Sequence, residues 1–349
     1  MRKMPEMTLF SLLILLLLAV AACGPAPNAS TPTPQTLPSV GTSSAYPAPQ
    51  DGYPAPNQGY PGAEAVPTEP PGRGVEGSGV TFPGQIAFHS RRSGSLQIHV
   101  MDGSSGVTHQ LTTSGGQAYE PGWSPDCSTI VYTQDVGGNL EIYTMSADGS
   151  NQRPLLIEAR PDTMEYAPAW SPAGDRIAFQ TNPEALFNVC IADTTGAIQS
   201  CLDRGNFSNA HPSWSPDGNT LLFVSNRTGS YEVYSKDMTS NAEAVQLTDN
   251  GGVNFHPRFS PDGQLIVFES QRVGNYDIYV MNRDGSGERQ LTNSPEDDTE
   301  PSWMGDQIVF TSYRSQDWEL YMMPLAGGEA TRLTYQPDED KGPAWCSAQ

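Results

Sequence analysis

The chain repeats one phrase six times, and this repeat constrains its fold more than any other feature. The best-preserved copy runs from His256 to Thr292 and contains the turn sequence SPDG, an apolar run and a second run around Tyr279. A period of roughly 40–47 residues with four short strands per copy is typical of a β-propeller blade. We therefore predict an all-β, six-bladed propeller of four-stranded antiparallel blades. The aromatic anchors of the six copies lie 42 to 47 residues apart: Trp123, Trp170, Trp214, Phe259, Trp303 and Trp345.

The first apolar run after each turn is continuous rather than alternating. Such a run indicates a strand buried on both faces, as between stacked blades. The first of these runs, at residues 86–90, has no anchor strand before it, whereas an anchor strand without a following run stands at residues 342–345. We expect the C-terminal strand to complete the first blade and close the ring, because closure removes open sheet edges.

The shared phrase, PxWSPDG…IxFxSxRxG…IYxM…LT, resembles the WD40-like repeat of the TolB propeller family. The resemblance covers residues 82–349 and is specific for fold rather than for function. Proteins of the TolB type carry an α/β domain ahead of the propeller, and here a Pro-rich tract stands in that place.

The N-terminal segment has the pattern of a bacterial lipoprotein signal. Arg2 and Lys3 precede an apolar run over residues 9–22, which is shorter than the roughly 20 residues of a spanning helix. The run ends in Ala21-Ala22-Cys23, which resembles a lipobox. We predict a signal peptide over residues 1–22 and lipidation of Cys23, with acyl chains such as palmitate anchoring the protein to the cell membrane or envelope. The alternative is an ordinary signal peptide with an incidental cysteine.

Residues 23–81 show no helical or strand periodicity and repeat Tyr-Pro phrases at 46–49, 53–56 and 60–62. Proline fixes φ and removes donors, so we expect a disordered, extended tether that holds the propeller at residues 82–349 away from the membrane. The alternative is a Pro-rich ligand for a groove.

Four of the 5 cysteines remain once Cys23 is assigned to lipid, and an oxidising compartment favours disulfides. Cys190 and Cys201 flank a predicted hairpin turn, which places them opposite each other for a cross-strand disulfide. Cys127, in a turn of blade two, and Cys346, beside the closing strand, could form a second bridge that pins the ring shut. The alternative is two free thiols.

The residue before the proline of each innermost strand should line the channel mouth. Aromatic residues precede three of these positions. Imidazole and carboxylate ligands suit divalent cations such as Ca²⁺ or Mn²⁺. His211, His256 and Glu300, on consecutive blades, therefore form a candidate metal set, and Glu120 across the opening could converge on the same cation. The alternative is a mouth that caps strands or binds a ligand without any cofactor. The predicted binding residues are Tyr119, Glu120, Tyr166, His211, Phe255, His256 and Glu300.

The net charge of −21 argues against nucleic-acid binding, and GxSxG, phosphate-loop and HExxH motifs are missing from the sequence. We therefore predict a monomeric, non-enzymatic, extracytoplasmic binding or scaffold propeller that recognises an envelope protein, peptide or glycan at its channel face. One alternative is a metal-dependent carbohydrate lyase or hydrolase, and another is a plain surface spacer. Recurring arginines are expected to form structural ion pairs: Arg92, Arg227, Arg272 and Arg314.

Overall fold

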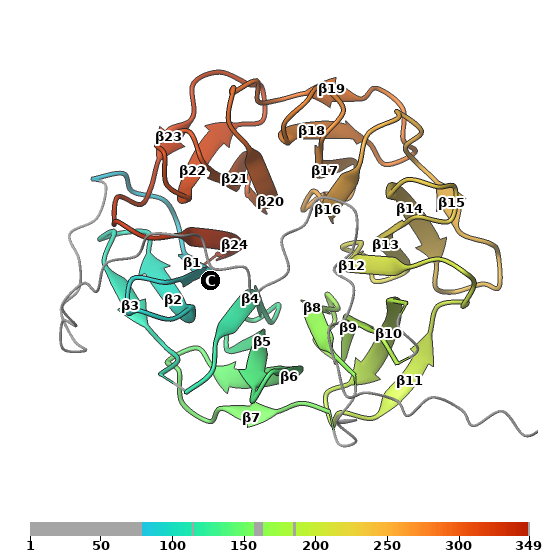
Figure 1. Cartoon of the computed structure of the whole chain (residues 1–349). Helices are drawn as coiled ribbons and strands as arrows, with labels where there is room; N and C mark the ends of the chain where they lie inside the picture. The colour runs from blue at the N-terminus through green and yellow to red at the C-terminus, as the bar shows by residue number, and fades with distance from the viewer. Residues whose placement is uncertain (1–78, 114, 157–162, 184–185, 348–349) are drawn as a thin grey trace, which may run out of the picture. The chain divides into compact units, whose positions relative to one another are not determined.

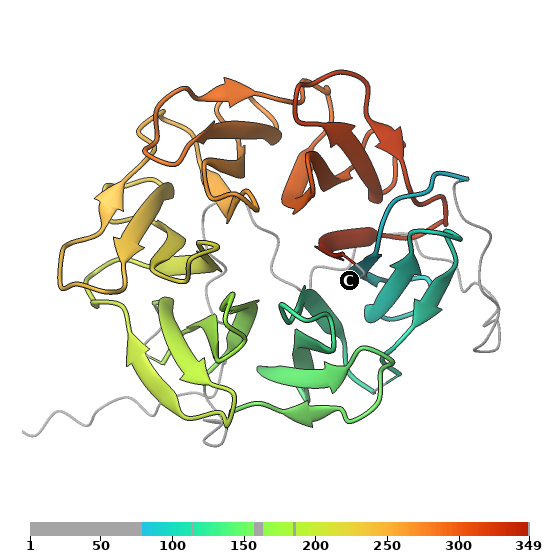
Figure 2. The same cartoon turned by 180° about the vertical axis from the view of Figure 1, so that it is seen from behind.

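The structure, a computed structural model, describes residues 79–113, 115–156, 163–183 and 186–347. Within these residues there are 24 strands and no helix. The strands form six four-stranded antiparallel sheets. The sheets are arranged as the blades of a ring (Figure 1), and the view from behind shows the same arrangement (Figure 2). The predicted six-bladed, all-β propeller is confirmed.

The strands of each blade are named A to D from the axis outward. Strands A, innermost in Figure 1, are β24 (Asp340–Cys346), β4 (Ala118–Trp123), β8 (Glu165–Trp170), β12 (Asn209–Trp214), β16 (Asn254–Phe259) and β20 (Asp298–Met304). Strands B are β1 (Gln85–Ser90), β5 (Thr129–Val136), β9 (Arg176–Thr181), β13 (Thr220–Ser225), β17 (Leu265–Ser270) and β21 (Gln307–Ser312). Strands C are β2 (Gln97–Asp102), β6 (Asn139–Ser146), β10 (Asn188–Asp193), β14 (Glu232–Asp237), β18 (Asp277–Asn282) and β22 (Glu319–Pro324). Strands D are β3 (Thr108–Gln110), β7 (Arg153–Pro154), β11 (Ile198–Cys201), β15 (Val245–Gln246), β19 (Arg289–Gln290) and β23 (Thr331–Arg332).

The C-terminal strand closes the ring as predicted. Strand β24 pairs with β1, so that Trp345 lies opposite Ile86. The Trp345 indole Nε1 also donates to the carbonyl oxygen of Pro83, 2.8 Å away. Blade one is therefore built from the two ends of the propeller sequence.

Both predicted disulfides are present. Cys190 and Cys201 are partners in the β10–β11 register, with their Cα atoms 3.9 Å apart. Cys127 and Cys346 join the A–B turn of blade two to the end of β24, with a Cα separation of 6.0 Å. The second bridge fastens blade one to blade two at the point where the ring closes.

Six hydrophobic cores lie between neighbouring blades, including one between blades six and one. In one of them, Val267 and Val280 of blade five pack with Ile308 and Phe310 of blade six. Burying a side chain of this size contributes about 1.5–3 kcal/mol, and burial on both faces explains the continuous apolar pattern of strand B. The central aromatic residue of every strand B is buried: Phe88, Tyr132, Phe179, Phe223, Phe268 and Phe310.

Antiparallel order gives the propeller two chemically different faces. The A–B and C–D turns lie on one side, here called the turn face, and the B–C and D–A loops lie on the other, the loop face. The turns repeat closely: Asp217 accepts from Ser215 Oγ at 2.5 Å and from the Asn219 amide at 3.0 Å, and Gly218 has a φ of 70°. Cys127 occupies the corresponding glycine position with a φ of 58°.

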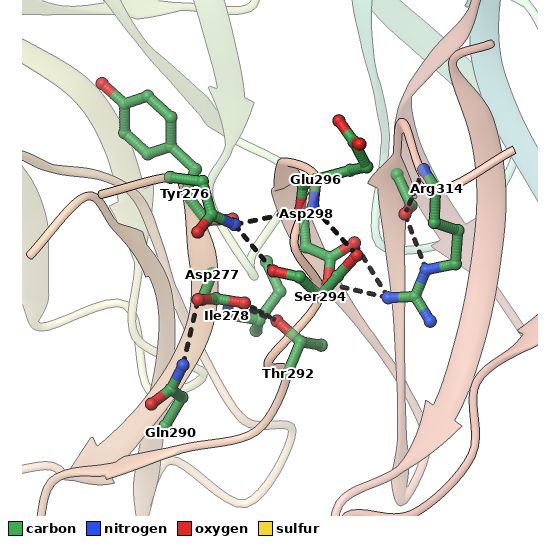
Figure 3. Close-up of polar contacts among 11 residues, drawn as sticks. Tyr276, Asp277, Ile278, Gln290, Thr292, Ser294, Glu296, Asp298 and Arg314 are labelled. Atoms are coloured by element: carbon green, nitrogen blue, oxygen red, sulfur yellow. Dashed lines mark hydrogen bonds and ion pairs between the residues drawn. The ribbon is translucent and has the colours of Figure 1, made fainter. Parts of the chain in front are cut away.

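Polar contacts also stabilise the loop-face ends of the strands in blades five and six (Figure 3). Asp277 accepts from Thr292 Oγ1 at 3.1 Å and from Gln290 Nε2 at 2.9 Å. In the next blade Asp298 pairs with Arg314, 2.7 Å away. The guanidinium of Arg314 also lies over the Phe310 ring. These contacts make Arg314 a structural residue.

The other recurring arginines follow the same pattern. Arg92 pairs with Asp340 at 2.6 Å, and Arg272 pairs with Glu288. Arg227 instead donates to the side-chain oxygen of Asn209, 3.1 Å away. The expected ion pairs are thus present for three of the four arginines.

The predicted signal peptide, Cys23 and nearly all of the predicted tether lie outside the described residues, so these assignments stay predictions. Within the part of the chain that the structure does describe, no helix has the length and apolar character needed to cross a membrane.

Candidate functional site

The predicted mouth residues share one unusual backbone feature. Each adopts a left-handed conformation, with φ between 49° and 64°, which is uncommon outside glycine. The register between strands A and B shifts at the same point in every blade, which marks a β-bulge. A bulge re-aims side chains and releases a backbone amide from the ladder. The six residues are Glu120, Ala167, His211, His256, Glu300 and Gly342.

The released amides are bound by side chains of the preceding blade. The amide of Ala167 donates to Glu120 Oε2 at 2.8 Å, and that of His211 donates to Gln180 Oε1 at 2.8 Å. The amide of Gly342 donates to Glu300 Oε2 at 2.9 Å. Because a buried amide needs a partner, Glu120 and Glu300 have a structural role in the ring in addition to any role in binding.

Three mouth residues from different blades converge. Glu120, His211 and His256 each offer a ligand atom, and these atoms lie within 4.8 Å of one another. The two imidazole rings are in an edge-to-face arrangement with centroids 4.2 Å apart. The structure does not place Glu300 in this group: its Oε2 also accepts from Thr311 Oγ1 at 2.9 Å. The carboxylate gathered with the histidines is therefore that of Glu120, not that of the predicted Glu300.

The predicted aromatic residues each pack against another ring. Tyr119 packs edge-on against His89, with ring centroids 6.2 Å apart, and Tyr166 against Phe187 at 5.3 Å. Both tyrosines are half-buried. Phe255 is buried and packs edge-on against His211 at 5.4 Å, so it supports the histidine rather than presenting a surface.

An ion pair anchors His256. Its Nδ1 lies 3.1 Å from Glu269 Oε2, and the Glu269 side chain is fully buried. Burial alone would lower the pKa of His256, but the carboxylate of Glu269, followed by those of Glu300 and Glu120, outweighs burial and raises it. His211 behaves in the opposite way: burial, the neighbouring His256 and Arg258 lower its pKa well below the usual range.

The two mouth glutamates are also shifted in opposite directions. Burial raises the pKa of Glu120, with Glu300 adding to the effect and His256 opposing it. Burial acts in the same sense on Glu300, but Lys341, His89 and His256 overcome it and lower the pKa of Glu300 to about 2. Separated pKa values in neighbouring carboxyl groups characterise functional sites, although structural ion pairs produce them too.

The sequence-based prediction missed the second ring of the channel. This ring comes from strand B, at the position after its buried aromatic residue, and includes His89, Gln180, Glu269 and Thr311. A polar residue in an otherwise apolar strand was the available signal, since buried polar groups need partners. Arg258, two residues after His256, was also missed.

Chemically, the mouth offers two imidazoles and a carboxylate to a cation, and hydrogen-bonding groups to a ligand. Apolar side chains on the surrounding loops add a surface suited to a partner. The exposed large apolar residues of the B–C and D–A loops are Val136, Leu186, Val273, Tyr313 and Tyr335.

Comparison with known proteins supports the propeller assignment. The TolB beta propeller domain family matches residues 157–249 and 240–349. An uncharacterized protein of Agrobacterium fabrum is 30% identical over 93 residues, which are 27% of this chain and 31% of that protein. The match thus spans less than a third of that relative's length.

Solved structures show the same fold. TolB from Acinetobacter baumannii superposes with a TM-score of 0.66 and 22% identity, covering 77% of this chain and 68% of its own. A putative TolB from Agrobacterium tumefaciens gives a TM-score of 0.58 and 22% identity, covering 75% and 92%. An oligogalacturonate lyase in complex with manganese gives a TM-score of 0.53 and 16% identity, covering 72% and 75%. At these identities the similarity concerns fold alone.

Proposed function

The chain belongs to the TolB β-propeller family, and from this premise we propose that it binds or scaffolds an envelope protein, peptide or glycan at the loop-face mouth of its channel. The fold supports a binding role in general. The observation that carries the specific proposal is the set of exposed apolar residues in the loop-face connections of several blades, together with the half-buried Tyr119 and Tyr166 at the mouth. Partner surfaces are enriched in aromatic residues around apolar patches.

We further propose that the protein acts outside the cytoplasm as a monomer anchored through lipidated Cys23. Two disulfides support this location, because thiols stay reduced in most cytosols. The predicted tether would let the propeller reach partners at a distance from the membrane.

Matched surface variants test the binding site. Val273 on the loop face and Val245 on strand D of blade four are both 59% exposed, so Val273→Asp and Val245→Asp make the same chemical change at two places. Full-length protein would be crosslinked in the envelope of its own cells, and the crosslinked species would be identified and quantified. We expect Val273→Asp to reduce the yield at least tenfold and Val245→Asp to leave it unchanged. Equal yields from both variants would refute binding at the loop face.

A second candidate function is a metal-dependent carbohydrate lyase or hydrolase. It is favoured by the convergence of Glu120, His211 and His256 within 4.8 Å. The test is release of unsaturated uronates or new reducing ends from acidic polysaccharides supplied with Mn²⁺. Activity that disappears in His211→Gln would support an enzyme, and its absence in the wild type would support the binding protein.

A further inference from the structure

We propose that Glu120, His211 and His256 form a binding site for one divalent transition-metal ion of the zinc and cobalt class. The site goes beyond the binding function proposed above, which needs no metal. It rests on residues that are separated by up to 136 positions in sequence and are brought together only by closure of the ring.

The spacing of the donor atoms fits a shared ion. Ligand atoms about 2.0–2.2 Å from a zinc ion lie roughly 3–4 Å from one another. The three donor atoms already lie within 4.8 Å of one another, so small side-chain rotations would bring them onto a common ion. The three residues occupy equivalent bulges, with φ of 49° in each case.

Two of the three proposed ligands have an orienting partner. Glu269 Oε2 lies 3.1 Å from His256 Nδ1, so Nε2 would be the ring nitrogen that binds the metal. Glu120 Oε2 accepts from the amide of Ala167 at 2.8 Å. A carboxylate commonly accepts a hydrogen bond from the other nitrogen of a ligating histidine in metal sites, because it sets the tautomer and the ring orientation.

The donor set decides the class of metal. Two imidazole nitrogens and one carboxylate suit zinc, cobalt or manganese, whereas calcium requires six to eight oxygens. Three protein ligands leave an open coordination position, which a water molecule or a carboxylate of a bound partner would take.

The surrounding charges permit an added cation. Three carboxyl side chains, Glu120, Glu269 and Glu300, lie at the mouth with two cationic ones, Arg258 and Lys341, and a metal bound to His256 would take the place of any proton on that ring. Arg258 is the main competitor, because its guanidinium interacts with both Glu120 and Glu300. A bound ion would join blades two, four and five across the channel, and blade two shares no core with either of the other two.

Titration of the full-length, oxidised protein with Co²⁺ tests the site, with binding followed by calorimetry and by the visible absorption of the metal. We expect one equivalent per chain in the wild type. Glu120→Gln, which keeps the size of the side chain, and His211→Gln and His256→Gln should each weaken binding at least tenfold. His109→Gln is the matched control, because His109 is exposed on β3, away from the channel.

Glu300→Gln separates this site from the one predicted from sequence, and it should change the affinity less than threefold. The proposal is overturned if the wild type binds no stoichiometric metal, or if Glu120→Gln binds it as tightly as the wild type. Should a histidine variant fail to fold, as judged by circular dichroism, the result for Glu120→Gln decides. Loss of metal binding would leave the loop-face crosslinking result untouched, so the two proposals fail separately.

Discussion

The aspartates of the turn face and the carboxyl groups at the loop-face ends of the C strands have pKa values shifted in opposite directions. On the turn face, side-chain hydrogen bonds from a nearby serine or threonine are the main reason that the aspartate pKa is lowered. At the loop-face end of the C strands, burial is the main reason that the carboxyl pKa is raised: Glu232, Asp277 and Glu319. The lowered group comprises Asp102, Asp126, Asp148, Asp175, Asp193, Asp217, Asp237, Asp262 and Asp284.

The difference reflects where each face finds its partners. Turn-face aspartates are bound by residues of their own turn, as Asp262 is by Ser260, two positions away. Loop-face carboxyls are buried among other strands and blades, as Asp277 is beside Thr292 and near Asp298 of the next blade (Figure 3). The partners of the turn-face aspartates are thus set by residues close in sequence. The surroundings of the loop-face carboxyl groups depend on assembly of the ring and can differ between blades.

The largest expected effect concerns the disulfide that fastens the ring at the turn face. Cys127→Ser together with Cys346→Ser should lower the free energy of unfolding by about 2–4 kcal/mol, because the bridge spans 219 residues. The paired control is Cys190→Ser with Cys201→Ser, where the bridge spans 11 residues within one hairpin. Urea unfolding should show a smaller loss for the control, and an equal loss would contradict a special role for ring closure.

The second prediction concerns pH and the loop face. The pKa is raised to about 7 for Glu319 and to about 6 for Asp277. The folded state therefore holds these protons more tightly than the unfolded chain does, and the stabilisation present below about pH 4 is lost as the pH rises toward 6–7. The free energy of unfolding of the wild type should therefore decline over this pH range. With solvent screening considered, we expect this decline to be roughly 1 kcal/mol smaller in Glu319→Gln.

Urea midpoints measured between pH 4 and 8 give the comparison. Glu329→Gln, at an exposed glutamate, is the control and should keep the wild-type profile. A Glu319→Gln profile as steep as that of the wild type would show that burial at the blade junction does not control this transition.

The turn face should respond to acid instead. Hydrogen bonds from Ser215 lower the pKa of Asp217, so its stabilising effect is present above about pH 4 and lost as the pH falls through its lower folded value. Asp217→Ala should cost below about 1 kcal/mol at pH 7, because the group is partly exposed. The difference from wild type, measured by thermal unfolding, should shrink toward pH 2, and a difference that grows in acid would be inconsistent with this account.

The smallest effect on stability is expected from the exposed valines. Val273→Asp and Val245→Asp should each change the free energy of unfolding by no more than about 0.5 kcal/mol, because neither side chain is part of a core. Thermal unfolding of the two proteins checks this. A large loss in Val273→Asp would mean that the loop-face residue supports the fold, and its binding phenotype would then have no bearing on a partner surface.

Much of the site could be predicted from the repeat. The position before each strand-A proline identified the mouth residues, because equivalent positions of a closed ring meet at its axis. The prediction placed Glu120 across the opening from the histidines and Glu300, but it did not say which of the two carboxylates meets the histidines. It also did not include the support that Glu269 gives His256. Those contacts depend on bulges and on side-chain directions across blades, and neither has a local signature.

By itself, the sequence determined the number of blades, the closing strand, the turn chemistry and the pairing of Cys190 with Cys201 across one hairpin. These features follow from local periodicity and turn preference, which repeat within each segment of about 45 residues. Only the tertiary structure decided which side chains meet in the channel and which carboxyl groups are buried. The reason is that the channel and the blade junctions exist only after six separate sheets have packed side by side, and burial controls their electrostatics.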